Sequence, residues 1–297
     1  MEKYDFPSAV HLDTAKLDDK ILNWALETGL FASDSECSRY KDQRINWFAG
    51  YLFPQEDGEK LEDIMGFFFH LFLLDDLLDK RIDQKMLAFL KSLESFHFSE
   101  EETFLCMLGN GLKDFHTSYR NLLQDSRHRE AWEDCWISYL RSLQWELENK
   151  LHLRMPSLLE YRMMRPWASG VFLAIFFLRK DRYPDSCHAE LLEYDIARFI
   201  CLGNDLASFP KEFSAGDFHN ELVLLDGDSH EKVVEWVKKE LKSLHKRINV
   251  RARQIAQSSE SCHLWTEELL LMLGGCLFWT EETSRYMTST NGKSTGF

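Results

Sequence analysis

The sequence predicts an all-α protein built as one domain, and three observations carry this prediction. Glycine and proline are scarce, with 14 Gly and 6 Pro in 297 residues, which argues against an all-β architecture with many tight turns. The few strong turn signals leave long segments that are compatible with helices. At residues 229–258, Val233, Val237 and Leu241 recur at helical spacing among lysines and glutamates.

The turn signals and the apolar spacing place the helices in order along the chain. We predict helices at residues 18–29, 36–49, 58–80, 83–94, 100–124, 128–150, 157–179, 187–212, 219–224, 229–258 and 262–287. Neither an internal repeat nor a low-complexity linker divides the sequence. We therefore expect a single domain over residues 1–297, with residues 288–297 as a polar tail that frays.

Composition and charge exclude several classes of partner. The formal net charge of −14 repels nucleic acid and anionic membranes, so we expect neither as a partner. The seven cysteines form no CxxC pair and their number is odd, which indicates reduced thiols in a cytoplasmic protein. The N-terminus is charged, and the longest apolar stretches, 67–78 and 171–178, are short, so we expect no signal peptide and no integral membrane segment. A monomer and a homodimer both fit this composition.

Three aspartates follow the mostly apolar segment at residues 66–74. Asp75 and Asp79 are one helical turn apart and share a face, whereas Asp76 lies about 100° further round the helix. Carboxylates at the C-terminal end of a helix meet its partial negative charge, and like charges this close need cations. Hard divalent ions such as Mg²⁺ prefer oxygen ligands of this kind. The alternative is a helix that ends in a solvated acidic turn.

A second oxygen-rich stripe lies at residues 204–212. Asn204, Ser208 and Glu212 are spaced four apart, so an amide, a hydroxyl and a carboxylate share one helical face. This set suits one Mg²⁺ ion. Pro210 removes a helical hydrogen bond, so we expect a kink that tilts Glu212 inward. The alternative is a polar helix end that runs into a loop.

Three arginines are candidates for binding an anionic group. Arg165 and Arg285 lie in apolar surroundings, and a guanidinium binds a diphosphate in a bidentate manner. For Arg162 we favour a surface ion pair. Lys211 precedes Glu212 and could reach a phosphate as a point charge.

In this combination and order, the motifs resemble those of microbial-type class I terpene synthases, also called terpene cyclases. The resemblance rests on the DDLLD string at residues 75–79, the NDLASFPKE string at residues 204–212 and the pair Arg285-Tyr286. Softer similarities extend it over nearly the whole chain, at residues 24–30 and 216–220. The resemblance implies the class I terpenoid synthase fold, a helical bundle around an apolar cavity.

The resemblance also implies a role for each candidate residue. Three Mg²⁺ ions, for which Mn²⁺ can substitute, would be held by Asp75, Asp76, Asp79, Asn204, Ser208 and Glu212. The diphosphate would be bound by Arg165, Lys211, Arg285 and Tyr286. Asp75, Arg165, Arg285 and Tyr286 would be the catalytic residues, and Arg162 is the alternative to Arg165 as the residue that senses the diphosphate. A helix break at residues 168–170 would point a backbone carbonyl at the cation.

The implied reaction explains this residue list. An allylic diphosphate leaves only if its developing charge is stabilised by metal ions and by cationic side chains. Aromatic faces stabilise the resulting carbocation by roughly 0.5–2 kcal/mol each. The candidates that line such a cavity are Phe68, Phe72, Trp167, Ser169 and Trp279, with ordinary core packing as the alternative for each aromatic ring. We expect the acidic cluster and the polar stripe to face each other across one apolar cup.

Farnesyl diphosphate, cyclised to a sesquiterpene, is the expected substrate. Two alternatives remain: a diterpene synthase that acts on geranylgeranyl diphosphate, and a non-catalytic helical protein that binds prenyl diphosphates. A chain-elongating prenyl diphosphate synthase is disfavoured, because it would carry a second aspartate-rich motif in place of residues 204–212. A di-iron bundle is disfavoured because suitably placed ExxH pairs are absent from the sequence.

Overall fold

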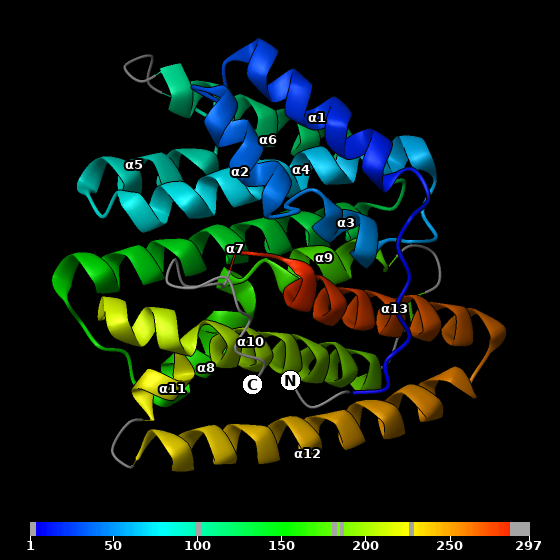
Figure 1. The fold of residues 1–297 in the computed structure, drawn as a ribbon. Helices are drawn as coiled ribbons and strands as arrows, with labels where there is room; N and C mark the ends of the chain where they lie inside the picture. The colour runs from blue at the N-terminus through cyan, green and yellow to red at the C-terminus, as the bar shows by residue number, and fades with distance from the viewer. Residues whose placement is uncertain (1–3, 99–102, 180–182, 185–186, 226–228, 286–297) are drawn as a thin grey trace. The chain divides into compact units, whose positions relative to one another are not determined.

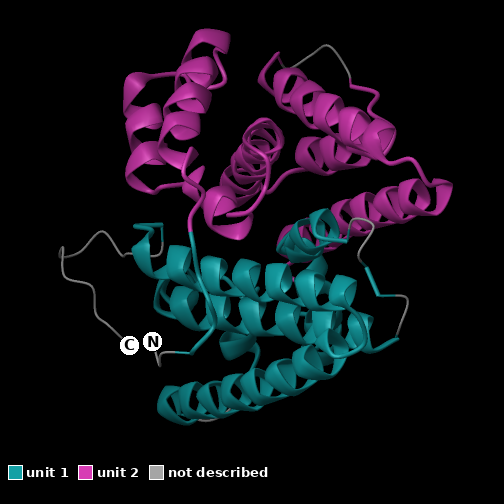
Figure 2. Cartoon of the chain, turned by 90° about the vertical axis from the view of Figure 1, so that its right-hand side faces the viewer, with its two compact units in different colours: residues 1–9, 155–297 teal, residues 10–154 magenta. Residues whose placement is uncertain are grey.

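Every regular element in the described part of the chain is a helix, so the all-α prediction is confirmed (Figure 1). The computed structural model describes residues 4–98, 103–179, 183–184, 187–225 and 229–285. The described residues fall into two compact units, one within residues 10–154 and the other within residues 1–9 and 155–297, which are described separately below (Figure 2). The expectation of a single domain stays a prediction.

The unit of residues 10–154 is built around α4. Its helices are α1 (Thr14–Thr28), α2 (Asp34–Asp42), α3 (Trp47–Leu52), α4 (Gly58–Lys80), α5 (Gln84–Leu93), α6 (Thr103–Leu122) and α7 (Ser126–His152). Helix α4 packs against α1, α3 and α6, and α5 packs against α7. The Asp57 carboxylate caps α4 by accepting from the amide of Glu59 at 3.0 Å. The predicted bounds of α4 are confirmed, and its apolar middle, including Phe67 and Phe69, is buried.

One predicted helix of this unit is wrong. Residues 36–49 were expected as one helix, but they belong to α2 and α3, which are separated by residues 43–46. Arg44 lies between them with a φ of 53°, in the left-handed region that ends a right-handed helix. Because neither glycine nor proline occurs at this turn, the sequence carried no signal for it.

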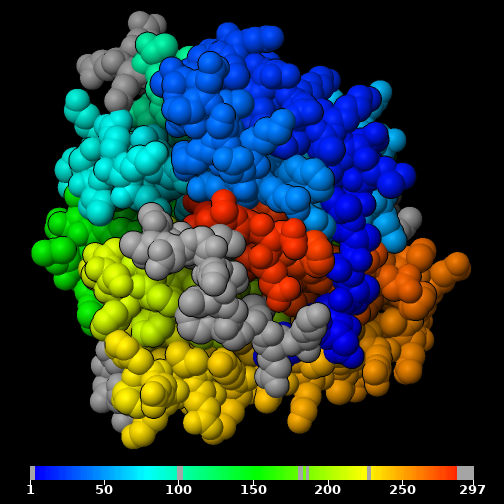
Figure 3. All heavy atoms as spheres, viewed as in Figure 1, coloured from blue at the N-terminus to red at the C-terminus, as the bar shows by residue number. Residues whose placement is uncertain are grey.

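The second unit is built around α10. Its helices are α8 (Leu158–Ala168), α9 (Val171–Phe177), α10 (Cys187–Ala215), α11 (Glu221–Leu224), α12 (His230–Ala256) and α13 (Glu260–Glu282). Helix α10 packs against all of the others in this unit. Helix α12 is amphipathic as predicted: Val237, Leu241 and Leu244 are buried, and the opposite face lies along the surface (Figure 3). Within the described residues, the helices lack the combination of length and apolar character that crossing a membrane requires.

Two features of this unit shape the candidate site. The predicted helix 157–179 is interrupted between α8 and α9, where Gly170 adopts a φ of 71° that other residues rarely adopt. This is the helix break that the resemblance implied. Helix α10 continues through Pro210 to Ala215, three residues beyond its predicted end. The polar stripe therefore lies within the helix and not at its frayed end.

Candidate active site

The acidic cluster lies in the last two turns of α4, in the unit of residues 10–154. Asp75 is exposed, and the Asp79 side chain is 56% exposed, with one oxygen 3.9 Å from the Lys150 ammonium. Asp76 differs from both, because its side chain is only 12% exposed. Its Oδ2 accepts from Nη2 of Arg39 at 2.9 Å and from the Tyr40 hydroxyl at 3.1 Å. Two solvent-facing carboxylates therefore flank one that is bound by α2.

The surroundings change from solvent at Asp75 to core at Phe68, two turns earlier in the helix. The buried phenol of Tyr139 on α7 has its pKa raised by burial, and the negative charge of Asp75 acts in the same direction. Phe72 is half-buried, with its ring 5.4 Å from that of Phe48. Phe68 is 4% exposed and packs against Phe48 in an aromatic cluster. One face of α4 therefore changes from aromatic to anionic residues along the helix, as predicted.

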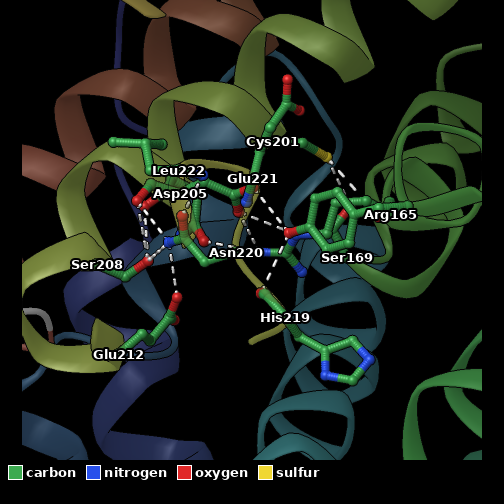
Figure 4. A network of polar contacts seen from close by, with 12 residues as sticks. Arg165, Ser169, Cys201, Asp205, Ser208, Glu212, His219, Asn220, Glu221 and Leu222 are labelled. Atoms are coloured by element: carbon green, nitrogen blue, oxygen red, sulfur yellow. Dashed lines mark hydrogen bonds and ion pairs between the residues drawn. The ribbon is translucent and has the colours of Figure 1, made fainter. Parts of the chain in front are cut away.

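The polar stripe on α10 lies in the other unit and is far more enclosed. The Ser208 side chain is buried and donates from Oγ to the backbone oxygen of Asn204 at 3.0 Å. Oδ1 of Asn204 accepts from Nη2 of Arg165 at 2.9 Å. Glu212 accepts at Oε2 from the Asn220 amide at 2.8 Å (Figure 4). Each member of the stripe is thus held by a hydrogen bond.

Burial gives this stripe an unusual electrostatic setting. It raises the pKa of Glu212 to about 7, and the nearby carboxylate of Asp205 acts in the same direction, while the Asn220 amide opposes both. Asp205 is itself 1% exposed, and its burial raises its pKa, with Arg165 and Tyr161 acting against this shift. A bound cation would favour the charged form of both carboxylates.

The two candidate arginines of α8 have different partners. Arg165 donates from Nε to Oδ1 of Asp205 at 3.1 Å and from Nη2 to Asn204, so it lies directly against the polar stripe. Arg162 donates from Nε and Nη2 to Glu221 at 2.9 and 2.7 Å, and its guanidinium lies over the ring of Trp236. The surface ion pair favoured for Arg162 from the sequence is corrected by the structure: Arg162 does form an ion pair, but its partner Glu221 is fully buried. Arg165 is the arginine in contact with the second motif.

Ser169 lies at the helix break between α8 and α9. Its hydroxyl donates to the Pro166 oxygen at 3.1 Å and lies 3.3 Å from Sγ of Cys201 on α10. The Cys201 thiol is directed at the backbone oxygen of Arg165, at 3.8 Å. These contacts join the helix break to α10 at Cys201, which lies about one turn before Asn204.

The other predicted site residues have varied settings. Trp167 is half-buried, with its ring 4.3 Å from that of Phe172, and Trp279 on α13 is 2% exposed. Lys211 is exposed on α10. Arg285 is half-buried, and its backbone amide donates to Thr283. Tyr286 lies outside the described residues.

Five residues to which the sequence analysis gave no role complete the polar network. Oδ2 of Asp205 accepts from the Tyr161 hydroxyl at 2.7 Å and from the Glu221 amide at 3.1 Å. Glu221 is fully buried and also pairs with Arg198. Asn220 joins the loop to the stripe. The partners of Asp205 come from α8 and α11, and no local spacing in the sequence connects them.

The residues of both motifs fit a hard metal ion. Amide, hydroxyl and carboxylate oxygens are ligands for Mg²⁺ and Mn²⁺, whereas zinc sites use thiolates and imidazoles. Within the described residues, no group of three or more His, Cys, Asp or Glu side chains could hold a metal by itself. Mg²⁺ is usually bound by one or two carboxylates together with water and substrate phosphates, which agrees with this composition.

Comparison with known proteins places the chain in a family. The family described as "Terpene synthase family 2, C-terminal metal binding" matches residues 67–247, a range that includes both motifs. The (+)-eremophilene synthase of Sorangium cellulosum (strain So ce56) is 25% identical, over 96% of this chain and 91% of its own. The (+)-T-muurolol synthase of Roseiflexus castenholzii is 25% identical, over 85% and 78%.

A solved structure shares the fold. The linalool/nerolidol synthase from Streptomyces clavuligerus superimposes with a TM-score of 0.80, covering 94% of this chain and 100% of its own at 16% identity. The family match extends over more than half of the chain, and the relatives are similar over most of their lengths. The chain therefore belongs to the class I terpene synthases, a family of metal-binding enzymes.

Proposed function

We propose that this enzyme ionises farnesyl diphosphate with the aid of Mg²⁺ and cyclises the carbocation to a sesquiterpene. The names of two relatives support the choice of substrate. The (+)-T-muurolol synthase and the 4-epi-cubebol synthase of Streptosporangium roseum are both named as cyclising (2E,6E)-farnesyl diphosphate. Both are similar to most of this chain, at 25% and 21% identity.

One observation carries the proposal for the site. One face of α10 carries three kinds of oxygen that could bind a metal ion, those of Asn204, Ser208 and Glu212. The Arg165 guanidinium donates a hydrogen bond to the Asn204 side chain. A metal-bound diphosphate needs both features, oxygen ligands for the ion and a cationic donor for the phosphate oxygens. The exposed carboxylates of Asp75 and Asp79 supply the second set of ligands in the proposal.

The remaining roles follow from the chemistry of each side chain. When bound, Mg²⁺ acts as a Lewis acid that stabilises the leaving diphosphate. We assign metal binding to both motifs: Asp75, Asp76, Asp79, Asn204, Ser208 and Glu212. The diphosphate is bound by Arg165, Lys211, Arg285 and Tyr286. The aromatic rings of Phe68, Phe72, Trp167 and Trp279 exclude water and stabilise the cation. Ser169, at the helix break, is assigned to the same cavity.

A product assay tests this function. The purified protein is incubated with geranyl, farnesyl or geranylgeranyl diphosphate and Mg²⁺, and products are identified by gas chromatography and mass spectrometry. We expect cyclic fifteen-carbon products from farnesyl diphosphate, and none when EDTA removes the metal. Cyclic products from geranylgeranyl diphosphate alone would contradict the substrate, and turnover in EDTA would contradict the metal dependence.

A further inference from the structure

The loop after α10 brings its last residue back to the polar stripe. Gly216 follows the end of α10 with a φ of 72°, which reverses the chain. The amide of Asp217 donates to the Glu212 backbone oxygen at 3.0 Å, and the Asp217 carboxylate accepts from the amide of His219 at 2.8 Å. These bonds set the course of residues 216–219 and deliver Asn220 to the side of α10.

The Asn220 side chain is fully buried, and every polar atom of its amide has a partner. Nδ2 donates to Oε2 of Glu212 at 2.8 Å and to the backbone oxygen of Asp205 at 2.7 Å, with Oγ of Ser208 at 3.4 Å (Figure 4). Oδ1 accepts from the amide of Leu222 at 2.8 Å and so caps α11. One amide thus connects the loop, α11 and the polar stripe.

The chemistry of this position requires an amide. A primary amide offers two N–H donors and one acceptor, and all three are used here. One donor binds Oε2 of Glu212, and the other binds the backbone oxygen of Asp205 on the same helix. Among the described residues, none donates a hydrogen bond to the other oxygen, Oε1. The carboxylate is therefore fixed in one orientation with one oxygen committed to Asn220.

We propose that Asn220 is a positioning residue for metal binding, because it orients the Glu212 carboxylate before an ion arrives. This inference rests on the proposed function, in which Glu212 is a metal ligand. Removing a group that hydrogen-bonds to a metal ligand, without touching the metal itself, lowers metal affinity by about 10–100-fold. Asn220 lowers the loss of side-chain freedom that Glu212 incurs on binding the ion.

Asn220 could also have a purely structural role, because it caps α11. A variant that keeps the cap but loses the contact with Glu212 separates this role from the positioning of the carboxylate. In Asn220→Ser, the hydroxyl still caps α11, because serine caps helices about as well as asparagine. Its shorter side chain does not reach Glu212. The matched control is Asn46→Ser in the other unit, since Asn46 is also buried and donates to a buried carboxylate, that of Asp18, at 3.0 Å.

The experiment measures Mn²⁺ binding to the full chain in the presence of inorganic diphosphate, by electron paramagnetic resonance. We expect Asn220→Ser to weaken binding by about 10–100-fold. Asn46→Ser should lower the melting temperature and leave Mn²⁺ affinity unchanged. A double-mutant cycle adds specificity: in a Glu212→Gln background, Asn220→Ser should cause no further loss, because its effect acts through that carboxylate.

Several outcomes would overturn the inference. They are an affinity of Asn220→Ser within twofold of wild type, an equal loss in Asn46→Ser, or losses that add in the cycle. If Asn220→Ser does not fold, as judged by circular dichroism, Asn220→Thr keeps the cap and is measured in its place; failure of both to fold makes Asn220 a residue of the fold only. Absence of Mn²⁺ binding by the wild-type protein would instead contradict the proposed function itself.

Discussion

The two motifs proposed to bind metal differ in how they are built. At the end of α4, Asp75 and Asp79 are exposed, and the Lys150 ammonium stays 3.9 Å from Asp79. On α10, Ser208 is buried, and Glu212 is hydrogen-bonded to the fully buried Asn220. The first motif is a set of charges at the surface of its unit, and the second is part of a hydrogen-bonded interior.

This difference in burial predicts which of the two motifs contributes to the stability of the fold. Carboxylates exposed at the C-terminal end of a helix contribute nothing favourable to folding, since they oppose the helix dipole. Buried polar groups must be satisfied by the protein itself, because an unpaired one costs free energy. Changes at the exposed Asp75 and Asp79 of α4 should therefore affect catalysis alone, whereas changes around α10 should affect stability as well.

The largest expected effect on stability comes from Glu221→Ala. The change leaves the guanidinium groups of Arg162 and Arg198 without the buried carboxylate that both contact. Breaking a buried pair in this way costs about 3–5 kcal/mol in the free energy of unfolding. Urea denaturation measures the loss. Glu235→Ala on the exposed side of α12 is the control and should unfold as wild type does; equal curves for both variants would contradict the buried network.

The largest effect on catalysis without a loss of stability is expected for Asp75→Asn. The variant weakens binding of the metal ion that would stabilise the leaving diphosphate, and losing such stabilisation lowers kcat by about 10²–10³-fold. The melting temperature should stay the same or rise slightly, because a negative charge is removed from the end of α4. Asp63→Asn, an exposed aspartate on the same helix, is the matched control and should retain full activity. A parallel loss of stability and activity in Asp75→Asn would abolish the contrast between the motifs.

Arginine-to-lysine changes should distinguish the two arginines of α8. Arg165→Lys keeps the charge but loses the paired contacts with Asn204 and Asp205, so kcat/KM should fall by about 10²-fold. Arg162→Lys loses its contacts with Glu221 and Trp236, and should lower stability by about 1–2 kcal/mol with kcat/KM unchanged. The opposite pattern would make Arg162 the residue that senses the diphosphate.

The most gradual effect concerns the pH dependence of stability in the unit that carries α4. Burial lowers the pKa of His116 to about 4, and the charge of Arg120 acts in the same direction. Because the unfolded chain takes up this proton near pH 6.5, stability should fall as the pH drops from 6.5 to 4, by about 1 kcal/mol per pH unit. Glu133, 3.3 Å from Nε2, favours the protonated form and reduces the slope.

His116→Phe tests this assignment by chemical denaturation between pH 7 and 4.5. Phenylalanine suits the site, where the imidazole already stacks on Trp132 and lies near Phe96. The variant should show a shallower acid dependence than wild type. The same slope in both proteins would assign the acid sensitivity to other groups.

Local patterns made much of the fold predictable. Helix α4 has the predicted bounds because an aspartate cap precedes it and a mostly apolar run, residues 66–74, fills its middle. The turn between α2 and α3 was not predictable, because it depends on a left-handed arginine, Arg44, with no glycine or proline nearby. The end of α10 was predicted at residue 212, yet the helix continues through Pro210 to Ala215, and the kink expected at Pro210 stays a prediction.

The same division applies to the site. The four-residue spacing of Asn204, Ser208 and Glu212 was visible in the sequence because helical geometry is local. The partners of Asp205 were not, since Tyr161 and Glu221 come from other helices and meet it only through packing. Asp76 was grouped with its neighbours, but its contacts with Arg39 and Tyr40 depend on where α2 lies against α1 and the rest of its unit.

Crystals grown with Mn²⁺ and inorganic diphosphate test the central claim most directly. Anomalous scattering should place ions within about 2.5 Å of carboxylate oxygens of Asp75 and of Glu212, near the distance at which such ions bind oxygen. Ions bound only at other residues, or ions at one motif with the other facing solvent and empty, would contradict the claim that both motifs bind the metal.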